Sequence, residues 1–272
     1  MGYLADTATA TSAFLAGRLG KPLLIEGPAG TGKTDLARAV SEASKRRLIR
    51  LQCYEGLDES KVLYEWNYRK QLLRLQADQG GEGKQETWDD IFSEPFLLER
   101  PVLEAIRSKE PVVLLIDEID RIEMETEALL LEVLADFRIT IPEMGTLQSA
   151  TRPFTVLTSN ATRELSEALK RRCLYLWLDY PSMEREKAIV MSRLPNMDEK
   201  LASEVVKVVR SLRGLDLKKS PSIAETLDWA QTLQELGIGK VDEDKVSETM
   251  GSLLKHPADL DKAREHGLGV AG

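Results

Sequence analysis

The chain has 272 residues, of which 37 are Lys or Arg and 45 are Asp or Glu, giving a formal net charge of -8. With 42% hydrophobic residues it can build a core, but its longest strongly apolar run, 112–116, is far shorter than the about 20 residues of a membrane helix. The first residues also lack the basic and apolar regions of a secretion signal. We therefore expect a globular cytoplasmic protein without a membrane span.

Charge and residue usage exclude several classes of site. The acidic balance argues against nucleic-acid binding, because duplex binding normally needs a basic surface facing the phosphates. The two cysteines, Cys53 and Cys173, are far apart, and the two histidines, His256 and His266, fall near the end of the chain. A disulfide framework, a Cys/His zinc site or a Ser-His-Asp triad therefore lacks its residues. Chemistry must use carboxylates, Lys, Arg, Asn or Thr.

The first two thirds of the sequence alternate between helical and strand patterns. Helical spacing of apolar residues predicts helices, and short apolar or alternating runs predict strands. A polar, glycine-containing stretch at 78–86 predicts a mobile surface tip, and 138–153 predicts a hairpin. In chain order, the expected helices cover 5–18, 36–46, 58–77, 97–107 and 126–136, and the expected strands cover 23–25, 48–51, 112–116, 154–158 and 174–178.

This alternation predicts an α/β fold in which helices cover both faces of a parallel sheet, over residues 1–180. After Pro181 only helical patterns remain, at 183–194, 198–213, 222–236 and 243–255. The third of these is expected to begin with Ser220 as N-cap and Pro221 at its first position. We therefore expect a small all-helical lid domain over 181–255 and a loosely attached polar tail over 256–272.

A glycine-rich segment follows the first expected strand and precedes a helix. It fits the phosphate-loop pattern G-x-x-x-x-G-K-[ST], in which backbone N–H groups and the positive end of the next helix surround phosphate oxygens. Its lysine should reach the β and γ phosphates of a nucleotide, and its last hydroxyl should serve Mg²⁺. The alternative is a glycine-rich turn that fits by chance. The segment consists of Gly27, Pro28, Ala29, Gly30, Thr31, Gly32, Lys33 and Thr34.

Two acidic residues, Asp117 and Glu118, end the apolar run 112–116. Because α/β folds bind ligands at the carboxyl ends of their strands, both carboxylates should face the nucleotide. Asp117 would hold Mg²⁺ directly or through water, and Glu118 would activate the attacking water. The alternative is an ordinary solvated acidic turn that also contains Asp120.

Three further residues have positions suited to catalysis. Asn160 ends a strand and could orient water against the γ-phosphate, or it could simply cap the turn. Arg171 and Arg172 end the helix before 174–178; they either oppose the helix dipole or stabilise transition-state charge at a neighbouring subunit's γ-phosphate. The chain has no Asn-Lys-x-Asp element for reading guanine, which favours ATP as the nucleotide.

With these elements in this order, the chain resembles the AAA+ ATPases, and within them the MoxR-type branch of the helix-2-insert clade. The landmarks are GPAGTGKT at 27–34, VVLLIDEID at 112–120, LTSN at 157–160 and LKRRC at 169–173, followed by the helical lid. The stretch LQCYEGLDESKVLYEWNY at 51–68 is most similar to members associated with maturation of carbon monoxide dehydrogenase and related molybdenum hydroxylases.

The resemblance implies hydrolysis of ATP to ADP and phosphate by a ring, expected to be a hexamer, with ATP and Mg²⁺ between subunits. It also implies remodelling of an enzyme client or insertion of its metal centre, often with a partner that bears a von Willebrand factor A domain. Many relatives carry an arginine after a Ser-Pro pair in the third lid helix, where it senses the γ-phosphate. Here Ser222 follows Pro221, so no residue is assigned to that role.

Two segments are candidates for contacting a client, 54–67 with its aromatic residues and the hairpin at 138–153, although such residues are more often core. Two other functions remain open at this point. One is a nucleic-acid motor or clamp loader on the same fold, against which the acidic balance argues. The other is a switch that binds ATP without turnover, against which Glu118 argues, because a switch has little need of a water-activating carboxylate.

Overall fold

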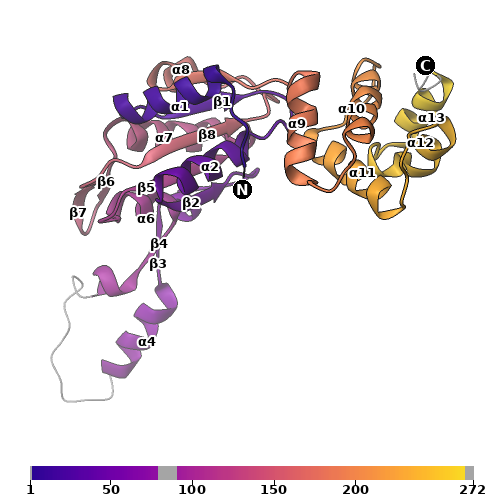
Figure 1. Cartoon of the computed structure of the whole chain (residues 1–272). Helices are drawn as coiled ribbons and strands as arrows, with labels where there is room; N and C mark the ends of the chain where they lie inside the picture. Colours follow the sequence, from indigo (N-terminus) through magenta and orange to yellow (C-terminus); the bar gives the residue numbers. More distant parts are fainter. Residues whose placement is uncertain (1, 79–90, 267–272) are drawn as a thin grey trace. The chain divides into compact units, whose positions relative to one another are not determined.

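The computed structural model describes residues 2–78 and 91–266 (Figure 1). The chain forms two compact units. The sheet unit comprises Ala5–Gly27 and Lys33–Trp177, and the helical unit comprises residues 2–4, Pro28–Gly32 and the described residues from Leu178 onward. Each is described separately below.

A five-stranded parallel sheet forms the centre of the sheet unit. Its strand order is β2-β5-β8-β1-β9, and every residue of β1, β5 and β8 is buried. Continuous apolar runs suit such central strands, because both of their faces are covered. The predicted α/β fold is therefore confirmed. The strands are β1 (Leu23–Glu26), β2 (Arg47–Gln52), β5 (Val112–Asp117), β8 (Phe154–Ser159) and β9 (Leu174–Trp177).

Helices lie on both faces of this sheet (Figure 1). The side chain of Asp6 caps the first of them by accepting a hydrogen bond from the Thr9 N–H at 2.7 Å. The helices are α1 (Thr7–Leu19), α2 (Lys33–Ser44), α6 (Pro101–Arg107), α7 (Met124–Asp136) and α8 (Glu167–Arg172), with a short 3-10 turn η2 (Ile119–Arg121) after β5. The apolar faces of α6, α7 and α8 join buried strand residues in one core, to which Leu103, Ile106 and Leu130 contribute fully buried side chains.

The helix predicted over 58–77 is interrupted by a strand, and the one predicted over 97–107 begins with a strand and becomes helical only from Pro101. The first segment forms α3 (Glu59–Val62), β3 (Tyr64–Trp66) and α4 (Tyr68–Asp78), and the second forms β4 (Leu97–Glu99) and α6, preceded by the 3-10 turn η1 (Glu94–Phe96). β3 and β4 pair antiparallel in a ribbon that leads from the sheet to α4 (Figure 1). Apart from Asp78, the tip expected over 78–86 lies outside the described residues.

The physical reason for the interruption is long-range pairing. Trp66 is buried and packs edge-on against Phe92, with ring centroids 5.2 Å apart, and the Asn67 N–H donates to the Phe96 carbonyl at 2.8 Å. These contacts join residues that are distant in sequence, and such long-range contacts override local helical periodicity. The hairpin expected within 138–153 is confirmed as β6 (Arg138–Ile141) paired antiparallel with β7 (Gly145–Gln148).

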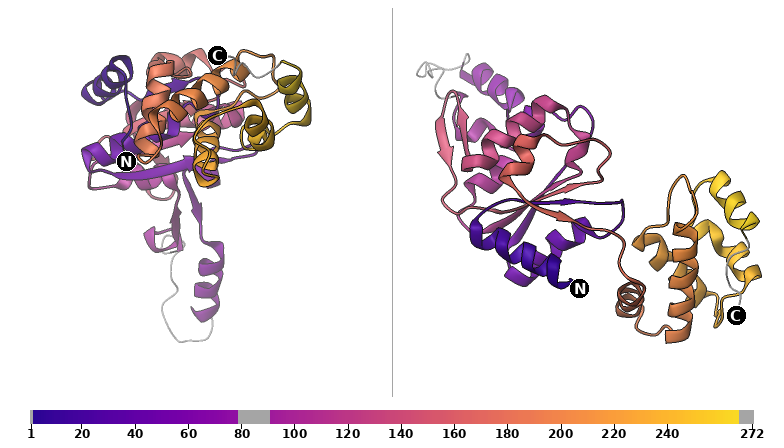
Figure 2. Two further views of the ribbon diagram at one scale, coloured as in Figure 1. Left: turned by 45° about the vertical axis from the view of Figure 1, so that its right-hand side comes forward. Right: turned by 90° about the horizontal axis from the view of Figure 1, so that it is seen from above.

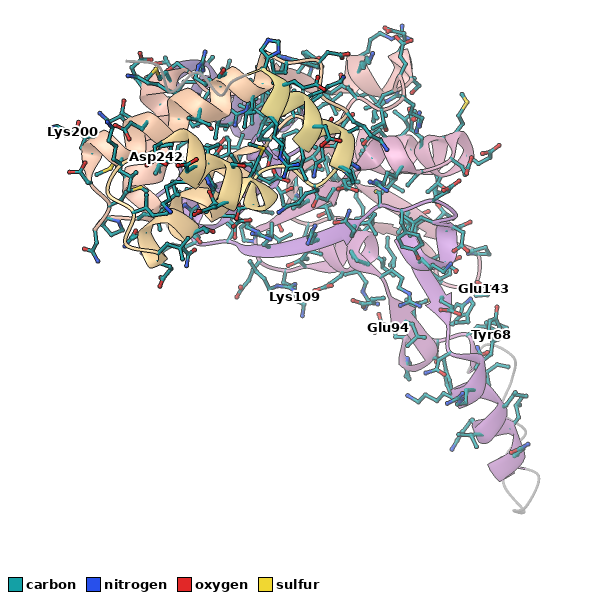
Figure 3. All side chains as sticks on the ribbon, turned by 90° about the vertical axis from the view of Figure 1, so that its right-hand side faces the viewer. Tyr68, Glu94, Lys109, Glu143, Lys200 and Asp242 are labelled. Atoms are coloured by element: carbon teal, nitrogen blue, oxygen red, sulfur yellow. The ribbon has the colours of Figure 1, made fainter. Side chains whose placement is uncertain are left out.

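The helical unit is a bundle around its own apolar core, and its helices are grouped together in Figure 2. Trp229 lies at the centre of this core, and Lys200 and Asp242 lie on the surface of the unit (Figure 3). The start of the chain joins it, since Arg185 Nη2 donates to the Leu4 carbonyl at 2.8 Å. The elements are α9 (Met183–Arg193), α10 (Glu199–Arg213), α11 (Ile223–Glu235), α12 (Glu243–Thr249), η3 (Met250–Ser252) and α13 (Pro257–Glu265).

Two details differ from expectation. The N-cap of α11 is Ser222 instead of Ser220, because Ser222 and Glu225 form a reciprocal capping box. The tail expected to be loosely attached contains α13, whose Ala263 is fully buried in the helical core and whose Asp259 accepts hydrogen bonds from the N–H groups of 218 and 219. No helix among residues 2–78 and 91–266 is both long and apolar enough to cross a membrane.

Candidate functional site

The phosphate loop connects β1 to α2, the position that the sequence predicted for it. Gly30 and Gly32 have φ values of +73° and +91°. Side chains other than glycine rarely adopt this left-handed conformation, so these positions need glycine to turn the chain. Between the two glycines, the Thr31 hydroxyl donates to the Pro28 carbonyl at 3.0 Å and closes the turn.

Lys33 begins α2 and is 6% exposed. Its Nζ donates to the Gly27 carbonyl at 2.8 Å, back across the start of the loop. Burial lowers the pKa of this ammonium group, and the nearby carboxylates of Asp120, Asp117 and Glu118 act in the opposite direction without reversing the shift. A desolvated cation held in this way is suited to an anionic ligand, which would replace the missing hydration.

Asp117 ends β5 and is 3% exposed. Its Oδ1 accepts hydrogen bonds from the Thr34 hydroxyl at 2.9 Å and from the Thr158 hydroxyl at 2.6 Å. Its Oδ2 accepts from the Arg50 guanidinium, at 3.1 Å from Nε and 2.5 Å from Nη2. The structure therefore brings the predicted pair Thr34 and Asp117 into direct contact and adds two partners that the sequence analysis did not single out.

The donor atoms around Asp117 suit Mg²⁺. This ion prefers hard oxygen ligands and is usually held by one or two carboxylates together with substrate phosphates and waters. Thr34 Oγ1 and Asp117 Oδ1 supply such oxygens 2.9 Å apart. The described residues contain no cluster of three or more Cys, His, Asp or Glu side chains suited to a metal ion. At the Thr34 and Asp117 oxygens, a nucleotide's phosphates and waters would complete the ligand set.

Glu118 follows Asp117 in a left-handed backbone conformation, with φ of +59°. Its N–H donates to the Thr158 hydroxyl at 2.9 Å, which fixes the turn after β5. Its carboxylate pairs with Arg121 Nε at 2.7 Å. A non-glycine residue in this conformation is strained, and such strain concentrates at functional sites. In this structure the Glu118 carboxylate is thus held by a cation three residues further on.

Asn160 lies directly after β8, and a buried aspartate holds its backbone in place. Asp120 accepts hydrogen bonds from the Asn160 N–H at 3.2 Å and from both the N–H and the hydroxyl of Thr162, at 3.1 and 2.6 Å. Burial raises the pKa of Asp120, but these hydrogen bonds outweigh it and leave the pKa below its ordinary value. The loops after β5 and β8 are thereby fastened together.

Arg171 and Arg172 end α8, as expected, and both are exposed. Each guanidinium turns back to its own helix: Arg171 Nε donates to the Glu167 carbonyl at 3.2 Å, and Arg172 Nη1 donates to the Ala168 carbonyl at 3.1 Å. Both accepting carbonyls belong to the first turn of α8, four residues before each arginine. Within the part of the chain that the structure describes, neither guanidinium is hydrogen-bonded to Thr34, Asp117, Glu118 or Asn160.

Three contributors to the site were missed: Arg50, Thr158 and, as an organising residue, Asp120. Thr158 belongs to the LTSN segment at 157–160, so this motif could have indicated that it lies near Asp117. Asp120 is the third acidic residue of the 117–120 segment, and the sequence did not predict that it is buried. Arg50 has no signal in the sequence, because its contact depends on how β2 and β5 pair.

Within the helical unit, the segment Pro28–Gly32 contacts the start of α11. The Ile223 N–H donates to the Gly30 carbonyl at 3.2 Å. A Cβ atom on Gly30 would lie only 2.1 Å from the Ser222 Cβ, so this close approach also requires glycine. Ser222 stands where the resemblance would place an arginine, and here it packs on the loop backbone.

Residues 22–173 match the family described as AAA domain, dynein-related subfamily. This match spans more than half of the chain. The chain belongs to this AAA family. Its parallel sheet, phosphate loop and helical C-terminal part form the AAA+ P-loop fold, which supports nucleotide binding and an ATPase.

The chain is also similar to uncharacterized proteins and to solved structures. An uncharacterized protein of Staphylococcus aureus is 30% identical over 225 residues, covering 80% of this chain and 77% of that protein. One of Staphylococcus epidermidis is 29% identical over 205 residues, covering 73% and 70%. The solved structure of a RuvB variant of Thermotoga maritima has a TM-score of 0.53 at 21% identity, covering 89% of this chain and 67% of that one, and a second variant has a TM-score of 0.52. At this identity the likeness concerns the fold.

Proposed function

We propose that this protein hydrolyses ATP with Mg²⁺ as a MoxR-type AAA+ remodelling or maturation ATPase. The observation that carries the proposal is the cluster at the carboxyl ends of β5 and β8. There Asp117 is hydrogen-bonded to Thr34 of the phosphate loop, and Glu118 follows it in a strained turn. Nucleotide binding alone requires only the phosphate loop. Hydrolysis also requires a nearby carboxylate that can activate the attacking water.

Each residue then has one task. Lys33 and the loop N–H groups bind the phosphates, and Thr34 and Asp117 hold Mg²⁺, which supplies Lewis-acid charge to the phosphoryl oxygens when bound. Glu118 accepts the proton of the attacking water, for which its carboxylate must leave Arg121. Asn160, placed by the Asp120 contacts, orients that water.

The assembly is part of the same proposal. We place ATP between subunits of a ring, with Arg171 or Arg172 supplied to the neighbour's γ-phosphate. Both guanidiniums are exposed, and their hydrogen bonds within the described residues go to carbonyls of their own short helix, contacts that exposed side chains can give up at small cost. The client class follows the resemblance: an enzyme that needs remodelling or metal insertion, as in carbon monoxide dehydrogenase maturation, with a partner bearing a von Willebrand factor A domain.

Two substitutions separate binding from hydrolysis. Lys33→Ala should abolish both, because it removes the charge that faces the phosphates. Glu118→Gln should keep ATP binding and lower the turnover rate by about 10² or more, the range for losing a positioned base. Nucleotide affinity is measured by equilibrium binding and turnover by phosphate release.

Glu125→Gln is the matched control, since Glu125 is an exposed glutamate in the first turn of α7. It should leave affinity and turnover unchanged. Equal loss of nucleotide affinity in Lys33→Ala and Glu118→Gln would contradict the division of roles.

A further inference from the structure

The Asp117 carboxylate has no vacant acceptor position in this structure. An ionised carboxylate offers about four lone-pair sites, two on each oxygen. Two hydroxyls, from Thr34 and Thr158, occupy Oδ1, and two nitrogens of the Arg50 guanidinium occupy Oδ2. A magnesium ion, or a water bound to it, therefore reaches Asp117 only when one of these donors withdraws.

The partners differ in how easily they can withdraw. Thr158 is 1% exposed and belongs to the central strand β8, so losing its hydrogen bond would leave a buried hydroxyl without that partner. Thr34 begins α2 beside the loop, and its hydroxyl can offer a lone pair to a metal while still donating its proton to Asp117. Neither residue needs to leave for the ion to bind.

Arg50 differs from both hydroxyl partners. Its side chain is 44% exposed, and β2 is an edge strand of the five-stranded sheet. On β2 it shares a face with Gln52, whose side-chain oxygen accepts a third hydrogen bond from the guanidinium. Water can reach the guanidinium side of this pair, but the Asp117 side chain is 4% exposed, so Arg50 can leave at small cost only if another cation takes its place beside the buried carboxylate. A guanidinium is also the one donor here that repels a divalent cation.

We propose that Arg50 is an exchangeable counter-ion for Asp117: it neutralises the carboxylate before nucleotide binds and is displaced when Mg²⁺ arrives with ATP. Arg50 thereby sets the affinity of the site for the metal and is a positioning residue with no role in the chemical step. The inference rests on the proposed function, because it takes the Thr34 and Asp117 pair as the Mg²⁺ site.

The test measures metal binding directly. Mn²⁺ replaces Mg²⁺, and its free concentration is followed by electron paramagnetic resonance in the presence of a non-hydrolysable ATP analogue. Arg50→Gln should tighten Mn²⁺ binding about fivefold to tenfold, because a positive charge a few ångströms from the ion is removed. Arg50→Lys keeps the charge and should stay within about twofold of the wild type. Thermal unfolding checks that each variant is folded.

Arg47→Gln is the matched control. Arg47 is an exposed arginine on the same strand, and it pairs with Glu104 away from Asp117. It should leave Mn²⁺ affinity unchanged. If wild type binds Mn²⁺ with the analogue and Arg50→Gln binds it equally or more weakly, the Arg50 proposal is overturned while the ATPase proposal stands. If wild type binds neither metal nor analogue, both proposals fail.

A second measurement needs no variant. In a structure of the wild-type protein with Mg²⁺ and the analogue, the Arg50 guanidinium should have left Asp117 Oδ2, with both of its nitrogens beyond hydrogen-bond distance. A guanidinium that still donates to Oδ2 beside a bound Mg²⁺ would overturn the exchange.

Discussion

Asp120 belongs to the acidic segment after β5, yet its role differs from that of its neighbours. It is 5% exposed, and its carboxylate accepts hydrogen bonds from three donors: the Asn160 N–H, the Thr162 N–H and the Thr162 hydroxyl. Three charge-assisted bonds on one buried carboxylate fix the loop that carries Asn160. Asp120, which has no proposed contact with the ligand, thus fixes the backbone position of the candidate catalytic residue Asn160.

Asp120→Asn should lower the free energy of unfolding by about 1.5–3 kcal/mol at pH 7, because hydrogen bonds to a charged acceptor are lost. The pKa of Asp120 is lowered in the folded protein, so its contribution is present above the unfolded value of about 3.9 and is lost as the pH falls through the folded value. The difference between wild type and variant should therefore shrink below about pH 4. Chemical denaturation across pH provides the measurement.

Asp136→Asn serves as the comparison, because Asp136 is an exposed aspartate whose ion pair with Arg138 is also exposed. It should change stability by less than about 0.5 kcal/mol. An equal effect of the two substitutions would remove the special role of Asp120.

At the residue scale, the sequence predicted those site residues that belong to a contiguous pattern. The loop 27–34 and the pair Asp117 and Glu118 are of this kind, and the structure places them at the carboxyl ends of the strands. Arg50 could not be predicted, because its contact arises from strand register. β2 and β5 pair so that Gln52 lies opposite Asp117, which brings the long Arg50 side chain, two residues earlier, within reach of that carboxylate.

At the scale of elements, the start of α11 shows a competition between two local signals. Ser220 followed by Pro221 is a common helix start, but the helix begins after Ser222, where Glu225 completes a capping box. Ser222→Ala should therefore cost about 1 kcal/mol of unfolding free energy, as loss of an N-cap does. Ser220→Ala should cost almost nothing, and denaturation of both variants distinguishes the two starts.

A larger cost for Ser220→Ala than for Ser222→Ala would contradict this assignment of the cap.

The helices expected over 58–77 and 97–107 show a second limit of prediction from sequence patterns. β3 is too short for its periodicity to stand out, and its pairing with β4 is decided by contacts between residues more than 30 positions apart. Local spacing contains no information on such contacts.

At the scale of the whole molecule, the proposed ring makes a prediction that a monomer cannot meet. The double variant Arg171→Ala, Arg172→Ala should bind ATP almost normally and hydrolyse it poorly, because the guanidinium acts on transition-state charge in the neighbour's site. Lys33→Ala should be inactive for the opposite reason. When the two are mixed, some interfaces pair an intact phosphate loop with intact arginines, so part of the phosphate release should return.

The mixture needs a companion measurement that subunits exchange, such as energy transfer between differently labelled copies. If exchange occurs and the mixture remains as inactive as either parent, the arginines act within their own subunit or only on α8. Their bonds to the Glu167 and Ala168 carbonyls would then be their main role.

The separate core of the helical unit has an optical consequence. Trp229 is the one tryptophan after residue 177, its ring is fully buried, and its Nε1 donates to the Thr249 hydroxyl at 2.8 Å. An indole in such surroundings emits at shorter wavelengths than one in water, and it shifts to the red only when this core opens. Cores built from different stretches of chain can open independently. In a variant that lacks the other three tryptophans, the fluorescence of Trp229 would therefore report the opening of the helical core without any attached dye.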